Sequence, residues 1–167
     1  MRSVSGLTLA LLGVLLTATA TMAQASGTKN DGWKSVKFCS MIFSVPETLK
    51  DNKAQGIDSC VASLSDNSVS LSIDYGLYSG VSRYDHYLDY EERDIVIGGR
   101  KGSIATYRDS TTAPEKSWVG RLFIVVEPPK DGWPAVATNM FVVVGSKAEL
   151  SIAERIIRSI KFNKSPR

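Results

Sequence analysis

Hydrophobic and polar residues alternate most regularly over residues 69–75. Val69, Leu71, Ile73 and Tyr75 fall on one side of an extended chain, and two serines and an aspartate lie between them. Strict alternation is typical of a strand with one buried face and one solvated face. We therefore predict a β-strand here, in a sheet covered on one side.

Further apolar stretches between turn signals predict the remaining strands. Pro46 ends the first of them, since proline cannot donate to a strand ladder, and residues 47–50 are expected to form one helical turn. Gly98-Gly99 supplies the positive φ that a tight hairpin turn requires. The predicted strands cover residues 33–45, 57–64, 94–97, 100–107, 118–126 and 135–144. The last is apolar on both sides, which indicates a central position.

Two segments have helical spacing instead. Residues 82–93 carry apolar residues three and four apart, and Ser82 with Asp85 makes a capping box, so a short inserted helix is predicted. Near the C-terminus, Ser146 and Glu149 form a second capping box. An apolar stripe then follows at helical spacing: Ala153, Ile156, Ile157 and Ile160.

These elements together predict an α+β fold. One antiparallel sheet of about six to seven strands is expected, covered on at least one face by the long C-terminal helix and by the short inserted helix. No internal repeat interrupts this layout.

The first 23 residues follow a different pattern. Arg2 gives a positive start, residues 7–16 are a Leu-rich apolar run, and small residues lead to Ala23 and Ala25. This order is typical of a secretory signal peptide cleaved after Ala23 or, alternatively, after Ala25. A membrane anchor is the other interpretation, but a spanning helix needs about 20 predominantly apolar residues. We therefore expect a periplasmic or secreted protein without a stable membrane anchor. It consists of the signal peptide (1–23), a flexible lead-in (24–32), one domain (33–162) and a tail (163–167).

Charge and cysteine content add two expectations. The chain has 167 residues and a net charge of +3, and its basic residues are spread along it, so no nucleic-acid partner is expected. Cys39 and Cys60 are its two cysteines. An oxidising compartment favours a disulfide between them, with free thiols as the alternative. Two cysteines and one histidine are too few for a zinc site, so neither a metal nor another cofactor is expected.

The order of several short motifs resembles small exported bacterial proteins of unknown function. More distantly, the chain is similar to PsbP-like domains. The motifs are Phe43-Ser44-Val45-Pro46-Glu47, Gly56-Ile57-Asp58-Ser59, Asp74-Tyr75-Gly76, Ile97-Gly98-Gly99-Arg100-Lys101 and Ser159-Ile160-Lys161-Phe162. The resemblance implies an α/β/α sandwich and accessory or binding roles that are mostly non-catalytic. It carries over no functional residue.

Catalytic motifs are not found. Gly76-Leu77-Tyr78-Ser79-Gly80 has the wrong spacing for a nucleophile elbow, and His86 is the single histidine. Gly98-Gly99-Arg100-Lys101-Gly102 is a candidate anion nest, although a hairpin turn is the simpler interpretation. We therefore assign no catalytic residue. An enzyme using His86 and nearby carboxylates is kept as a third hypothesis.

A tyrosine-rich acidic segment is the main candidate binding surface. Such surfaces suit cationic or peptide partners, but the same tyrosines at helical and strand spacing are also explained as core residues. Trp118 and Trp133 flank a proline-rich loop and form a second candidate rim. The candidate residues are Tyr78, Tyr84, Asp85, His86, Tyr87, Tyr90, Trp118 and Trp133.

The leading functional hypothesis is an exported, non-enzymatic binding or accessory protein of the cell envelope. Its partner would be an unknown protein or small ligand in the envelope or outside the cell. The alternative is an exported immunity or inhibitor protein that acts by protein–protein contact.

Overall fold

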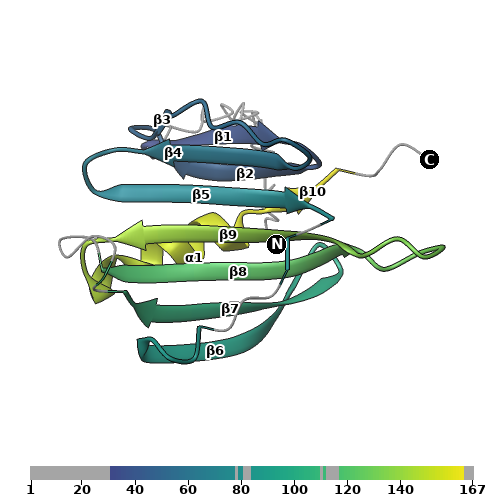
Figure 1. Cartoon of the computed structure of the whole chain (residues 1–167). Helices are drawn as coiled ribbons and strands as arrows, with labels where there is room; N and C mark the ends of the chain where they lie inside the picture. Colours follow the sequence, from purple (N-terminus) through teal and green to yellow (C-terminus); the bar gives the residue numbers. More distant parts are fainter. Residues whose placement is uncertain (1–30, 78, 81–83, 110, 112–116, 164–167) are drawn as a thin grey trace, which may run out of the picture.

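The structure is a computed structural model that describes residues 31–77, 79–80, 84–109, 111 and 117–163. These residues form two antiparallel sheets and one short α-helix, so the α+β class is shown (Figure 1). The predicted signal peptide, nearly all of the lead-in, Tyr78 and residues 164–167 of the tail lie outside the described residues. No helix within the described ranges is long and apolar enough to cross a membrane.

The larger sheet contains seven strands in the order β3-β4-β5-β9-β8-β7-β6. β9 pairs with both β5 and β8, which confirms the central position predicted for the apolar run at its end. The strand predicted over 69–75 and the hairpin around Gly98-Gly99 are also confirmed. The strands are β3 (Lys50–Asp51), β4 (Cys60–Ser65), β5 (Val69–Gly76), β6 (Leu88–Ile97), β7 (Arg100–Arg108), β8 (Trp118–Glu127) and β9 (Val136–Val144).

The smaller sheet has the order β1-β2-β10, with β1 (Trp33–Phe38), β2 (Met41–Pro46) and β10 (Lys161–Phe162). The sequence predicted one strand over 33–45, but the chain reverses at Cys39, whose φ of 48° lies in the left-handed region. The two halves then pair as an antiparallel hairpin. Both halves carry apolar residues, so the reversal left no gap in the hydrophobic pattern.

One hydrophobic core lies between the larger sheet and the layer formed by the small sheet and α1 (Leu150–Arg158). The inward residues of β5, predicted from the alternation, are buried there: Val69, Leu71 and Ile73. Figure 1 shows α1 behind β8 and β9. The helix approaches β8 closely, because a Cβ added to Gly120 would lie 2.5 Å from the Ala153 Cβ.

The C-terminal helix is shorter than predicted. It has nine residues, follows a 3-10 turn over Lys147–Glu149, and ends before Ile160, the last residue of the predicted stripe. The Ser146 backbone N–H donates to the Glu149 carboxylate, which is the reciprocal contact expected of a capping box. The buried side chain of Ile160 still joins the core, just before the chain continues into β10.

The predicted inserted helix over 82–93 is wrong. Residues 81–83 lie outside the described residues, Asp85 and His86 form a turn, and the chain is a strand from Leu88 onward. β6 lies at the sheet edge and exposes most of its residues, so it shows no regular alternation of apolar and polar positions. A few apolar residues at helical spacing were therefore misleading.

Two smaller predictions also differ from the structure. The strand expected over 57–64 begins only at Cys60, and the Ile57 side chain is fully exposed. Residues 47–50 form a turn followed by the start of β3 rather than a helical turn. The strands β3 and β10 were not predicted, since two residues are too few to show a period.

The connection from β5 to β6 determines what covers the outer face of the larger sheet. β9, β8 and β7 lie between β5 and β6 in the larger sheet, so the connection has to pass these three strands (Figure 1). We call its described residues, 77, 79–80 and 84–87, the crossing segment. The Gly80 carbonyl accepts a hydrogen bond from the Asn139 amide at 2.9 Å, which attaches this segment to β9.

Candidate functional site

A groove lies between β1 and β4, at the open side of the two-layered fold. β1 is an edge strand of the small sheet, and β3 pairs with β4 only at Leu64 and Ser65. The disulfide Cys39–Cys60 joins the residue after β1 to the first residue of β4. This disulfide confirms the predicted pairing and holds the two walls of the groove together.

The groove has a volume of about 410 Å³ and an apolar floor. Val36 and Phe38 of β1 share the side of the small sheet that carries the buried Phe43, while Ala62 and Leu64 belong to the core side of β4. A larger hollow of about 560 Å³ lies beside β3, but six mostly polar residues line it. The groove is the better candidate because an apolar floor with a few charges is typical of ligand sites.

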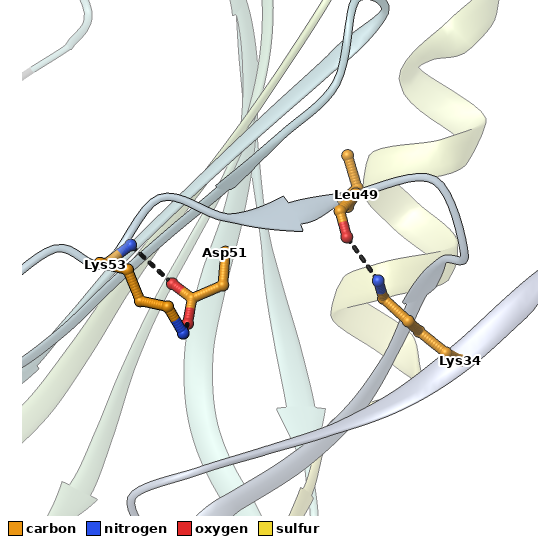
Figure 2. A network of polar contacts seen from close by, with 4 residues as sticks. All are labelled: Lys34, Leu49, Asp51 and Lys53. Carbon is orange, nitrogen blue, oxygen red and sulfur yellow. Dashed lines mark hydrogen bonds and ion pairs between the residues drawn. The ribbon is translucent and has the colours of Figure 1, made fainter.

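Three lysines line the groove, and one of them has a structural role. The Lys34 ammonium donates to the backbone carbonyls of Glu47, at 2.9 Å, and Leu49. Figure 2 shows the side chain reaching from β1 to the Leu49 carbonyl. Lys34 therefore holds the turn after β2 against β1, and its charge adds a positive field to the groove wall.

Lys53 and Asp51 form an ion pair at the mouth of the groove (Figure 2). Their atoms are 2.9 Å apart, and the side chains are 84% and 53% exposed. The Lys53 hydrogen bonds lower the pKa of the Asp51 carboxyl, so it is ionised at neutral pH. The Asp51 carboxylate also accepts from the Lys53 backbone N–H at 2.8 Å, which turns the chain out of β3.

Lys37 is the third lysine of the lining and is exposed on β1. Among the described residues it forms no ion pair. Alternation along β1 places its side chain on the side opposite Val36 and Phe38, so its ammonium can meet an incoming anion only at the rim of the groove. The three lysines and Asp51 together give the groove lining an excess of positive charge.

Glycines allow the loop between β3 and β4 to fold tightly beside the groove. A Cβ on Gly56 would lie 2.3 Å from the Ser59 carbonyl oxygen, and one on Gly76 would lie 2.9 Å from the Ser59 Cβ. Both contacts are shorter than a Cβ tolerates. The loop therefore packs on itself and on the end of β5.

The tyrosine-rich segment lies elsewhere, on the outer face of the larger sheet. The Tyr84 and Tyr87 rings stack on Tyr107 of β7, with centroids 5.5 and 4.8 Å apart. Tyr84 also covers the Arg121 guanidinium at 4.5 Å. Burial raises the pKa of Tyr107 well above its usual value. These rings pack the crossing segment onto the sheet, so they are partly buried rather than displayed.

Arg121 is the centre of this aromatic cluster and is only 2% exposed. Its guanidinium donates to the Asn139 side-chain oxygen at 2.7 Å, while its Nε is buried without a hydrogen-bond partner. Phe123 and Phe141 lie within 6 Å of the cation. No ion pair to Arg121 occurs among the described residues, so rings and one amide stabilise a buried charge. No local pattern in the sequence singles out this arginine.

The remaining members of the predicted tyrosine-rich surface differ in exposure. Asp85 and His86 are exposed at the turn, where the His86 ring lies 4.3 Å from the Tyr87 ring. Tyr90 donates to the Glu92 carboxylate at 2.6 Å, and burial with this bond raises the pKa of Tyr90 to about 12. Within the described residues, no three metal-ligating side chains gather around His86 or elsewhere.

Trp118 and Trp133 do not form one rim. Trp118 begins β8 beside α1, with the Lys147 ammonium 5.3 Å above its ring. Trp133 lies beyond the other end of β8 and is 66% exposed in the hairpin to β9. Trp118 is the first residue of β8, and Trp133 follows the last residue of that strand. The length of β8 therefore separates the two side chains.

The groove lysines were missed by sequence reasoning. A partial signal did exist, because Lys34, Val36 and Phe38 stand two residues apart and so share one side of β1, whereas Lys37 lies between them on the other side. The position of β4 opposite them depends on long-range pairing, which no local pattern reveals.

Comparisons with known proteins identify no relative that would assign this site. No protein-family model matches the chain, and no curated protein matches it. A crystal structure at 1.50 Å resolution from Bacteroides thetaiotaomicron VPI-5482 is similar at 13% identity, with a TM-score of 0.42. The match covers 75% of this chain and 46% of that one, so the chain spans less than half the length of that protein.

Proposed function

We propose that this is an exported, non-enzymatic binding protein that takes a small anionic amphiphile into the groove between β1 and β4. The observation that carries the proposal is an apolar floor beneath a rim of lysines. Such a site suits a ligand with an apolar body and one carboxylate or phosphate.

The size of the groove supports a small ligand. Its volume of about 410 Å³ falls within the range of roughly 300–1,000 Å³ of small-molecule sites. Among its lining residues Leu49 and Leu64 are buried, while Lys37, Lys53 and Gln55 are exposed. An apolar chain would therefore lie on the floor with its polar end at the mouth.

The charges of the rim support an anionic head group. Lys37 forms no ion pair among the described residues. Lys53 can leave its exposed ion pair with Asp51 to contact the ligand at little cost in free energy, because an exposed ion pair contributes about 0–1 kcal/mol. The carboxylate of Asp51 disfavours a second negative charge close to it. A single anionic group between Lys37 and Lys53 fits this arrangement best.

Export and the resemblance to PsbP-like domains agree with a binding role. The disulfide is consistent with an oxidising compartment. An accessory function in the cell envelope, and the finer PsbP-like arrangement of layers, remain part of the proposal.

The experiment is a calorimetric titration of the folded protein with dodecanoate, compared with dodecyltrimethylammonium. The anion is expected to bind and the cation, with the same chain, is not. Replacing Lys37→Gln together with Lys53→Gln should weaken dodecanoate binding by about two- to thirtyfold, the range supplied by two exposed ion pairs. Ala62→Phe should abolish it by filling the floor.

Lys101→Gln with Lys130→Gln is the matched control, because both lysines are exposed and lie outside the groove lining. Binding by this control should equal that of the unaltered protein. Equal binding of both surfactants, or equal losses in the two double variants, would overturn the proposal.

A further inference from the structure

β6 is a ten-residue strand at the edge of the larger sheet, and β7 is its neighbour. Its start is irregular, because Asp89 has a φ of 55° and the pairing register shifts between Leu88 and Glu91. From Glu91 to Ile97 the register is continuous. Among the described residues no second strand pairs with this regular stretch, which presents an open strand edge.

The hairpin turn tells which backbone groups face outward. Gly98 and Gly99 have φ values of 56° and 79°, as in a two-residue turn whose flanking residues, here Ile97 and Arg100, exchange hydrogen bonds. Bonded and non-bonded positions alternate along an antiparallel pair. The backbone N–H and C=O groups of Glu92, Asp94 and Val96 therefore point to the open edge.

The same three residues have side chains on the outer face of the sheet. Glu92 and Asp94 are exposed, and Val96 is 65% exposed between two buried isoleucines. Hydrogen bonds from Ser103 and Tyr90 lower the pKa of Glu92, so this carboxylate stays ionised. An exposed valine beside an open backbone edge is a feature that an edge strand without a partner usually avoids.

The single cation of β6 is engaged on the opposite face. Arg93 donates to Glu154 of α1 at 2.8 Å, and that carboxylate also binds Arg158. Arg93 therefore does not neutralise the carboxylates of the open edge. An added strand meets negative charge at Asp94 and Glu92, and again toward the bulge at Glu91 and Asp89.

We propose that the edge of β6 binds an extended, lysine- or arginine-rich segment of a partner protein, which adds a strand to the sheet beside Glu91–Ile97. Backbone hydrogen bonds at residues 92, 94 and 96 give the binding. Cations at alternate positions of the partner lie opposite Glu92 and Asp94, since directly opposite charges stabilise a strand pair. The partner strand also covers Val96.

A second copy of this chain fits the edge less well. Two β6 strands side by side would place carboxylates against carboxylates, and like charges opposite each other destabilise a pair. The acidic row thus selects against self-association while it favours a basic strand.

The experiment uses NMR amide hydrogen exchange on the whole protein with a peptide of alternating lysine and valine. The peptide should protect the amides of residues 92, 94 and 96 and leave the groove amides unchanged. A peptide with glutamate in place of lysine should not bind. A peptide with the same lysines, interrupted by proline, tests whether charge alone is sufficient.

Three variants separate edge pairing from general attraction. Glu92→Lys with Asp94→Lys should weaken binding of the lysine peptide by at least about fivefold and should strengthen binding of the glutamate peptide. Val96→Pro should abolish binding but keep the fold, because it removes an outward N–H and no contact with β7. Glu47→Lys with Asp58→Lys, a matched change at exposed positions away from β6, should bind normally.

Several results would overturn the proposal. They are the absence of binding, protection at other residues, equal binding of the proline-interrupted peptide, and an equal loss in the Glu47 and Asp58 variant. Sedimentation that shows dimers pairing through β6 in the free protein would also overturn it.

Discussion

Arg121 and Asn139 allow a sharp test of how the outer face is stabilised. The guanidinium is 2% exposed and, among the described residues, donates one side-chain hydrogen bond, to the Asn139 oxygen at 2.7 Å. The Asn139 amide nitrogen in turn donates to the Gly80 carbonyl of the crossing segment. Asn139→Leu keeps a similar size but removes both contacts. Within the part of the chain that the structure describes, this leaves only aromatic rings around the buried cation.

The expected magnitudes follow from these contacts. Loss of a hydrogen bond to a charged group costs about 1.5–3 kcal/mol, and loss of the neutral bond to Gly80 costs about 1 kcal/mol. Asn139→Leu should therefore destabilise the protein by about 3 kcal/mol. Arg121→Met removes the buried charge itself and should cost only about 1 kcal/mol, since an apolar residue needs no partner.

The decisive variant is the combination of Arg121→Met and Asn139→Leu. It has no buried cation left, so its free energy of unfolding should exceed that of Asn139→Leu alone by about 1–2 kcal/mol. Urea unfolding monitored by tryptophan fluorescence measures all four proteins. If the two single losses simply add, or if Arg121→Met costs more than Asn139→Leu, the reasoning about the buried charge is refuted.

Two further predictions concern the disulfide and the tyrosines. Replacing Cys39 and Cys60 by serine should lower the free energy of unfolding by about 3 kcal/mol, because the disulfide closes a loop with a sequence separation of 21 and so restricts the unfolded chain. A change below about 1 kcal/mol in urea unfolding would contradict this. Because the pKa of Tyr90 is raised to about 12, its contribution to stability is complete below pH 10 and is lost as pH rises toward 12. In alkaline titrations of unfolding, Tyr90→Phe should therefore flatten the loss of stability between pH 10 and 12, and an unchanged slope would exclude Tyr90 as its cause.

Some elements could be predicted because their signals are local. The period of two in β5, the glycine pair after β6 and the capping box before α1 each lie within a few residues. Each signal arises from a local requirement: one buried strand face in β5, a positive φ in the turn, and unpaired N–H groups at the start of the helix. The requirement acts on the same residues that show the pattern. The disulfide partners were also predictable, because two cysteines in an oxidising compartment leave one possible pair.

The candidate sites could not be predicted in the same way. Tyr84 and Tyr87 were recognised as a group, but their packing on Tyr107 depends on a connection that crosses three strands. The lysines of the groove are distant in sequence from the strand that faces them. In both places the relevant neighbours are brought together by strand order.

The sequence by itself determined the α+β class, most of the strands, the disulfide partners and the expectation of export. Tertiary structure alone decided that the apolar stretch over 33–45 folds into a separate sheet, that residues 88–97 form an open edge strand, and that Arg121 is buried under aromatic rings. The physical reason is the range of the interactions. Periodicity and turn chemistry act within one element, whereas strand order, edge exposure and the burial of a charge depend on residues far apart in the chain.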